Sequence, residues 1–125
     1  MTVGSPNLGN TISIILSDPV ASNKPYILAM AFSNSTGFFL SDGRRIPLNP
    51  DGLFFLTLFF PSAINLVNSV GALNSGGVAT ATWTIPTFAP AGITVYLAFV
   101  SLDPFLPIPQ GIISISPAIQ VTLLP

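Results

Sequence analysis

The chain has 125 residues and a formal net charge of −1; only 6% of the residues are charged, while 50% are hydrophobic. It contains no histidine and no cysteine. Their absence removes the usual general base at neutral pH, thiolate chemistry, disulfides and ordinary structural zinc sites. Three cationic residues are too few for a nucleic-acid-binding surface. We therefore predict a single domain that is not an enzyme and carries no cofactor.

The first eight residues show no alternating hydrophobic pattern, and Pro6 interrupts any regular ladder of hydrogen bonds there. We expect an N-terminal arm over residues 1–8, followed by one domain over residues 9–125. The arm is expected to lie either against a neighbouring subunit or as a first strand of the chain's own sheet. These residues lack the features of a signal peptide, so we expect a chain that is either not secreted or already processed.

Five segments alternate hydrophobic residues with polar or small ones, which predicts half-buried antiparallel strands. Proline and glycine separate the segments, and β-branched and aromatic residues are frequent within them. The segments are Thr11–Leu16, Tyr26–Phe32, Val78–Ile85, Ile93–Phe99 and Ile119–Leu123.

The connections also indicate short strands joined by tight turns. Asp42-Gly43 predicts a hairpin turn, and the run from Asn49 to Gly52 predicts another turn. Together with the shorter segments, the pattern gives about eight strands. We predict an all-β fold, a single antiparallel β-sandwich of immunoglobulin-like or jelly-roll type.

Two segments carry the most specific motifs of a family resemblance. The first is the hairpin DGR–(I/L)PL–x–PD–xLF, here Asp42–Phe54, and the second is (S/T)LDP…IS–x–A–(I/V), here Ser101–Ile119. Through them, and over nearly its whole length from about Leu8 onward, the chain resembles a small secreted β-sandwich domain that recurs at the C-terminal ends of exported proteins of planctomycete-type and myxobacterial-type bacteria. The resemblance implies a β-sandwich in an extracellular or cell-surface setting, without an established activity. Such domains usually end a longer protein, whereas here the domain is expected to stand alone.

The acidic residues offer one candidate cation site. Asp42, Asn49 and Asp51 place oxygen ligands of the kind that calcium prefers in neighbouring turns. Arg44 and Arg45 lie beside them in the sequence and would repel a cation, so we predict no metal and keep this site as the alternative. All four carboxylates adjoin proline or glycine, as expected of turn residues rather than of a catalytic pair.

Two further sites stay open on sequence grounds. Asn34-Ser35-Thr36 is the only N-x-S/T triplet, which leaves a glycan at Asn34 open. Trp83 and Tyr26 are in phase with apolar neighbours, whereas Tyr96 falls on a mixed face. A polysaccharide-binding accessory module that uses Tyr96 and loop residues is therefore the alternative function.

The segment Leu53–Phe60 is apolar on both faces of the strand that we expect it to form. As a strand it would turn Leu53, Phe55 and Phe59 away from the core. It is far shorter than the roughly 20 residues of a membrane-spanning helix, so we predict no insertion into a membrane. A large exposed apolar patch usually marks an interface, and low net charge favours association.

These features predict a non-enzymatic structural protein whose partner is another copy of itself. Strand addition between subunits is a heterologous contact, and such contacts generate open polymers. We expect an extracellular filament or surface assembly. The residues predicted to form its interface are Leu53, Phe55, Phe59, Phe38, Phe39, Ile119, Val121 and Leu123.

Overall fold

The structure, a computed structural model, describes residues 1–125 and consists mainly of antiparallel strands. One sheet has the order β1-β2-β8-β6, a second has the order β10-β9-β3-β7 with β11 also paired to β9, and β4 pairs with β5. The strands are β1 (Thr2–Val3), β2 (Thr11–Ser17), β3 (Pro25–Ala31), β4 (Phe38–Phe39), β5 (Arg45–Ile46), β6 (Leu66–Val67), β7 (Val70–Ala72), β8 (Val78–Thr84), β9 (Thr94–Leu102), β10 (Ile112–Ile115) and β11 (Ile119–Thr122). The helices are α1 (Gly52–Phe59) and two short 3₁₀ helices, η1 (Pro19–Ala21) and η2 (Pro61–Ile64).

The predicted all-β fold with antiparallel sheets is confirmed, and the five alternating segments correspond to β2, β3, β8, β9 and β11. The structure has eleven strands in three sheets, however, where we expected about eight strands in one sandwich. Five of the strands, β1, β4, β5, β6 and β7, are only two or three residues long. Segments this short have no room for a repeating pattern, so alternation does not reveal them. Only β4 and β5 have another signal, the turn between them.

The two larger sheets face each other across the main core, a cluster of 17 buried residues. Ile12, Ile14 and Leu16 of β2 point into it, while the residues between them are exposed. Trp83 of β8 is also buried, and its indole Nε1–H donates to the carbonyl oxygen of Ile64 at 3.0 Å. The alternation that predicted the strands thus places their apolar side chains in one shared layer, which gives a sandwich-like arrangement.

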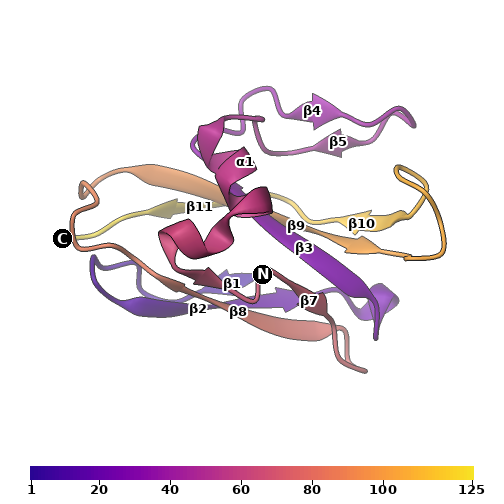
Figure 1. The fold of residues 1–125 in the computed structure, drawn as a ribbon, viewed down its shortest axis with the longest axis horizontal. Helices are drawn as coiled ribbons and strands as arrows, with labels where there is room; N and C mark the ends of the chain where they lie inside the picture. The colour runs from indigo at the N-terminus through magenta and orange to yellow at the C-terminus, as the bar shows by residue number, and fades with distance from the viewer.

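The second sheet is apolar on its outer face as well. Ala29 of β3 and Ala98 of β9 are paired across the strands and belong to a second cluster of six buried residues. The same cluster contains Ile46 of β5, Leu48 just after it and Phe54 of α1. Figure 1 shows α1 and the β4–β5 hairpin on the side of the second sheet that faces away from β2 and β8. The chain therefore covers this second apolar face with its own residues.

The hairpin turn predicted at Asp42-Gly43 is confirmed. It connects β4 to β5, and the backbone N–H of Leu40 donates to the carbonyl oxygen of Arg44 at 2.7 Å. Gly43 has a φ angle of 91°, a left-handed conformation that glycine adopts without steric cost. The turn thereby reverses the chain so that β5 pairs with β4.

The segment Leu53–Phe60, which we expected to be a strand, forms most of α1 instead. Asp51 caps the helix, because its Oδ1 accepts a hydrogen bond from the backbone N–H of Phe54 at 3.0 Å. The prediction was wrong because a run that is apolar at nearly every position fits the period of a strand and of a helix equally. No helix of the structure is long and apolar enough to span a membrane.

The N-terminal segment is held by the chain's own strands. Thr2 of β1 lies opposite Ile15 of β2. The backbone N–H of Leu8 donates to the carbonyl oxygen of Leu124 at 2.9 Å, and that of Leu124 donates to Pro6 at 3.0 Å. Of the two placements expected for residues 1–8, the structure has the pairing within the chain's own sheet.

Tyr26 gives the fold a specific sensitivity to alkaline pH. Its side chain is buried, its hydroxyl donates to the carbonyl oxygen of Asn68 at 2.6 Å, and burial raises the pKa of Tyr26 above its usual value of 10.0. The stability that this difference contributes is present below about pH 10 and is lost as the pH rises through the pKa of the folded state.

We expect Tyr26→Phe to lower the free energy of unfolding by about 1 kcal/mol at neutral pH, because the hydrogen bond is lost. As the pH rises above about 10, the free energy of unfolding should fall less in the variant than in the parent. Urea unfolding at a series of pH values measures both effects. Stability curves of parent and variant that stay parallel through this range would contradict the role given to Tyr26.

Candidate functional site

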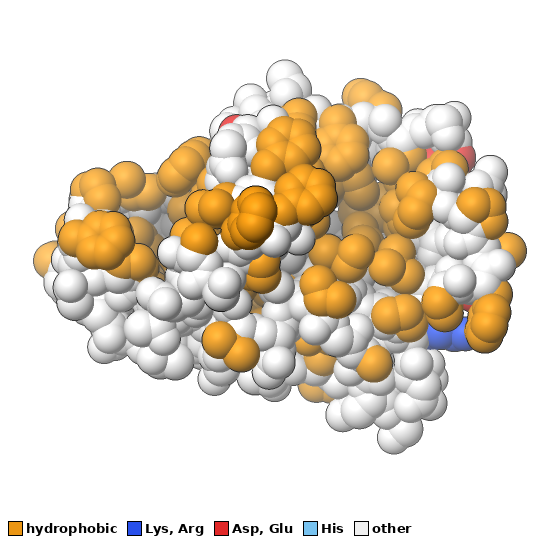
Figure 2. All heavy atoms as spheres, viewed as in Figure 1, with side chains coloured by type: hydrophobic (Ala, Val, Ile, Leu, Met, Phe, Trp, Pro, Cys, Tyr) orange, Lys and Arg blue, Asp and Glu red, His pale blue; other side chains and the backbone are white.

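An exposed group of phenylalanines lies on the outer side of α1; we call Phe55, Phe59 and Phe60 the aromatic surface. Phe55 is 48% exposed, Phe59 is 67% exposed and Phe60 is 66% exposed. The rings of Phe55 and Phe59 are stacked, with centroids 6.4 Å apart and an angle of 5° between their planes. Figure 2 shows apolar side chains gathered over α1 on this face of the molecule.

The helical period explains why these rings face outward. Phe54 and Thr57 are three residues apart and buried, so they define the inner side of α1. Phe55 and Phe59 are four residues apart and lie together on the other side. Phe54 also packs edge-on against Phe38 at 5.5 Å and against Phe55 at 5.4 Å. The aromatic surface is thus fixed to the second cluster through a continuous series of rings.

The structure brings together only part of the interface predicted from the sequence. Phe55 and Phe59 are neighbours on the aromatic surface. Phe39 is exposed on the β4–β5 hairpin, and Phe38 beside it is half-buried against the second cluster. Phe60 belongs to the exposed group although the sequence pattern assigned it to the opposite face of a strand. Reading the segment as a helix after an N-cap at Asp51 would have placed Phe55 beside Phe59, four residues on, but not Phe60, which follows the last helical residue.

The other predicted interface residues pack in or against the main core. Val121 and Leu123 are buried in the main core, because β11 pairs with β9 and turns its apolar face inward. Leu53 and Ile119 are half-buried and pack against the same core. Val121 and Leu123 are thus used inside the chain, whereas Leu53 and Ile119 keep part of their surface exposed.

The three candidate calcium ligands accept hydrogen bonds from nearby N–H groups. Asp42 Oδ2 accepts from the Arg44 guanidinium at 2.7 and 2.9 Å, and this hydrogen bonding holds the pKa of Asp42 below its usual value of 3.8. Asn49 Oδ1 accepts from the backbone of Gly37 at 2.7 Å, and Asp51 caps α1. No group of three or more histidine, cysteine, aspartate or glutamate side chains is placed to hold a metal ion.

The remaining sequence candidates lie apart from the aromatic surface. Asn34 is half-buried in the loop after β3, where its carbonyl oxygen accepts from Arg45 at 2.7 Å. Tyr96 is half-buried and packs against the second cluster, and Trp83 is buried in the main core. Neither ring is a flat exposed platform of the kind that a sugar-binding module uses.

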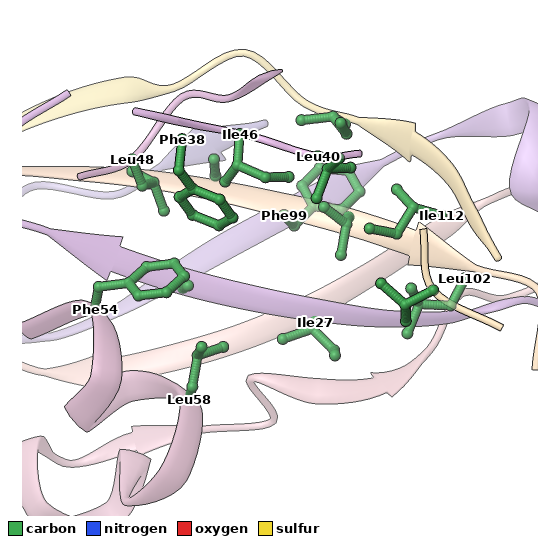
Figure 3. A pocket seen from close by; sticks show the side chains of 15 residues that line it. Ile27, Phe38, Leu40, Ile46, Leu48, Phe54, Leu58, Phe99, Leu102 and Ile112 are labelled. Carbon is green, nitrogen blue, oxygen red and sulfur yellow. The ribbon is translucent and has the colours of Figure 1, made fainter. Parts of the chain in front are cut away.

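A cavity of about 220 Å³ lies between the second sheet and the segments that cover its outer face. All 15 residues that line it are hydrophobic. Ala29 and Ala98 lie in the sheet, Phe54 and Leu58 reach in from α1, and Phe38 comes from the hairpin. Figure 3 shows the side chains of Phe38 and Phe54 close together at one end of this space, with Ile112 and Leu102 at the other end. No motif marks the cavity in the sequence, because its lining comes from segments far apart in the chain.

Comparisons of the chain with protein-family models, with curated proteins and with solved structures found no match. The likeness to a secreted β-sandwich domain thus stays a resemblance of sequence alone. The chemistry of the aromatic surface and of the cavity is what the molecule itself offers as evidence of function.

Proposed function

We propose that this chain is a non-enzymatic structural subunit that associates with copies of itself in an extracellular filament or surface assembly. The aromatic surface is the observation that carries the proposal. Phe55 and Phe59 expose large apolar rings on α1, and Phe60 exposes another directly after the helix. Burial of apolar area contributes about 25 cal/mol per Å², and aromatic residues are enriched at the cores of protein interfaces.

The distribution of charge favours a second copy as the partner. No charged residue occurs between Asp51 and Asp103, and the net charge of the chain is −1. Copies of such a chain repel one another little. A strongly charged partner would find no complementary charges on α1, whereas an equally apolar surface needs none.

Exposed aromatic residues at both ends of the molecule support an open polymer rather than a closed dimer. Phe88 lies in the connection from β8 to β9, and Phe105 lies in the connection from β9 to β10; each is 89% exposed. These two connections lie at opposite ends of the long axis in Figure 1. Contacts between unlike patches are heterologous, and they give filaments when the rotation between subunits does not close a ring.

The extracellular setting and the immunoglobulin-like or jelly-roll type of the sandwich belong to the same proposal. The resemblance of Asp42–Phe54 and Ser101–Ile119 to a secreted domain supports both. The alternative of a polysaccharide-binding module has less support, because the exposed rings are phenylalanines and Tyr96 is half-buried. Phenylalanine lacks the polar group with which tyrosine and tryptophan bond to hydroxyls.

The double variant Phe55→Asp/Phe59→Asp tests the proposal. We expect it to remain folded by circular dichroism, since both side chains are exposed, but to lose the large assemblies that light scattering detects in the parent. Val67→Asp/Val70→Asp is the matched control, because both valines are exposed and lie on β6 and β7 instead of α1. Equal scattering from the parent and the Phe55/Phe59 variant would show that the contact is wrongly placed.

A further inference from the structure

Beyond self-association, we propose that the cavity under the β4–β5 hairpin binds a small uncharged apolar molecule about the size of one aromatic ring. Its volume of about 220 Å³ is the first argument. Cavities of roughly 150 Å³ lined by leucine, isoleucine and phenylalanine stay dry and take up benzene. A space of this size and lining, opening between the hairpin and the sheet, is large enough for such a ligand.

The lining of the cavity selects against polar ligands. All of the lining residues are hydrophobic, and no buried side-chain nitrogen or oxygen of the protein lacks a hydrogen-bond partner. A hydroxyl or carboxylate placed there would give up its hydrogen bonds to water without replacing them, which costs several kcal/mol. Water itself needs two or more polar partners to occupy a cavity. The ligand class is therefore hydrocarbon-like.

The floor of the cavity explains why the space exists. Ala29 and Ala98, a cross-strand pair, present single methyl groups on the outer face of the sheet. On the inner face of the same two strands, Leu28 and Leu97 fill the main core with no exposed surface. Larger side chains such as Phe54 hold α1 and the hairpin away from the alanines. The empty volume thus follows from small residues at two central positions.

Arg44 connects the hairpin to the far rim of the cavity. Its guanidinium donates to the carbonyl oxygens of Ile112 at 2.6 Å and Pro109 at 2.9 Å, and it is paired with Asp42. Ile108 and Ile112, in the connection to β10 and in β10 itself, line the cavity at this rim. Arg44 does not line the cavity, so it ties the hairpin to this rim without making the cavity polar.

Toluene is the probe for this proposal. The protein is the Phe55→Asp/Phe59→Asp variant, so that neither self-association nor toluene binding at the aromatic surface contributes to the signal. We expect toluene to raise the melting temperature in a saturable way and to shift the methyl NMR signals of Ala29 and Ala98. Phenol, which adds a hydroxyl to a ring of similar size, should bind at least about tenfold more weakly than toluene. Absence of saturable shifts at the two alanine methyls would overturn the proposal.

A variant that fills the cavity separates this site from binding elsewhere. Ala98→Leu is expected to weaken toluene affinity at least about tenfold while the circular dichroism spectrum is unchanged. Ala72→Leu on β7 adds the same atoms at an exposed position and should leave the affinity unchanged. If Ala98→Leu does not fold, Ala29→Leu fills the same floor. Unchanged toluene affinity in the folded cavity-filling variant would refute the assignment.

Discussion

Replacing Phe54 with alanine is expected to lower the free energy of unfolding by about 3–5 kcal/mol. Phe54 is only 7% exposed and belongs to the second cluster. Its ring contacts Phe38 edge-on and holds α1 against the outer face of β3 and β9. Truncation would remove that apolar area and enlarge a cavity that is already present, so the surroundings would have little with which to fill the gap.

Phe55→Ala is the matched control, because Phe55 carries the same ring but is partly exposed on the outer side of α1. The Phe55 side chain is 48% exposed, so its truncation should change the free energy of unfolding by less than about 1 kcal/mol. Urea unfolding at a concentration where the chain is monomeric measures both variants. Equal losses at the two positions would mean that α1 does not present Phe54 inward as described.

Thr57→Val is expected to destabilise the chain by about 1–3 kcal/mol, although valine has nearly the same shape. Thr57 is 1% exposed. Its hydroxyl accepts a hydrogen bond from the backbone N–H of Met30 at 3.1 Å and donates to the carbonyl oxygen of Phe54 at 2.9 Å. Valine would leave the Met30 N–H buried without a partner where α1 crosses β3.

Thr57→Ser separates the hydroxyl from the methyl group of the same residue. Serine keeps both hydrogen bonds and loses one buried methyl, so it should be less destabilising than valine. Urea unfolding of the parent and the two variants measures this: if the dependence of the free energy on urea is the same, the midpoints rank the three proteins by stability. A valine variant as stable as the parent would show that the Met30 N–H has another partner.

The strands of the main core could be predicted from the sequence, whereas the cover of the second sheet could not. Alternation in Thr11–Leu16 and Val78–Ile85 reports the contrast between a buried and an exposed face, and β2 and β8 have that contrast. In β3 and β9 both faces are buried, so the alternation weakens to a change of size, as between Leu28 and Ala29. Such a strand indicates that something covers it but not what does.

The same limit applies to the candidate interface. The sequence shows an excess of apolar residues, and the fold uses most of it internally, as with Val121 in the main core and Phe54 in the second cluster. What remains for a neighbour is decided by α1, whose helical period places Phe55 beside Phe59. The local signal for that helix was the N-cap at Asp51, which the apolar run after it obscured.

Sedimentation velocity of the unmodified chain, from about 1 µM to about 1 mM, tests the central claim of self-association most directly. The aromatic surface predicts species larger than the 13.1 kDa monomer whose share grows with concentration. A single 13.1 kDa species throughout that range would contradict the proposed function.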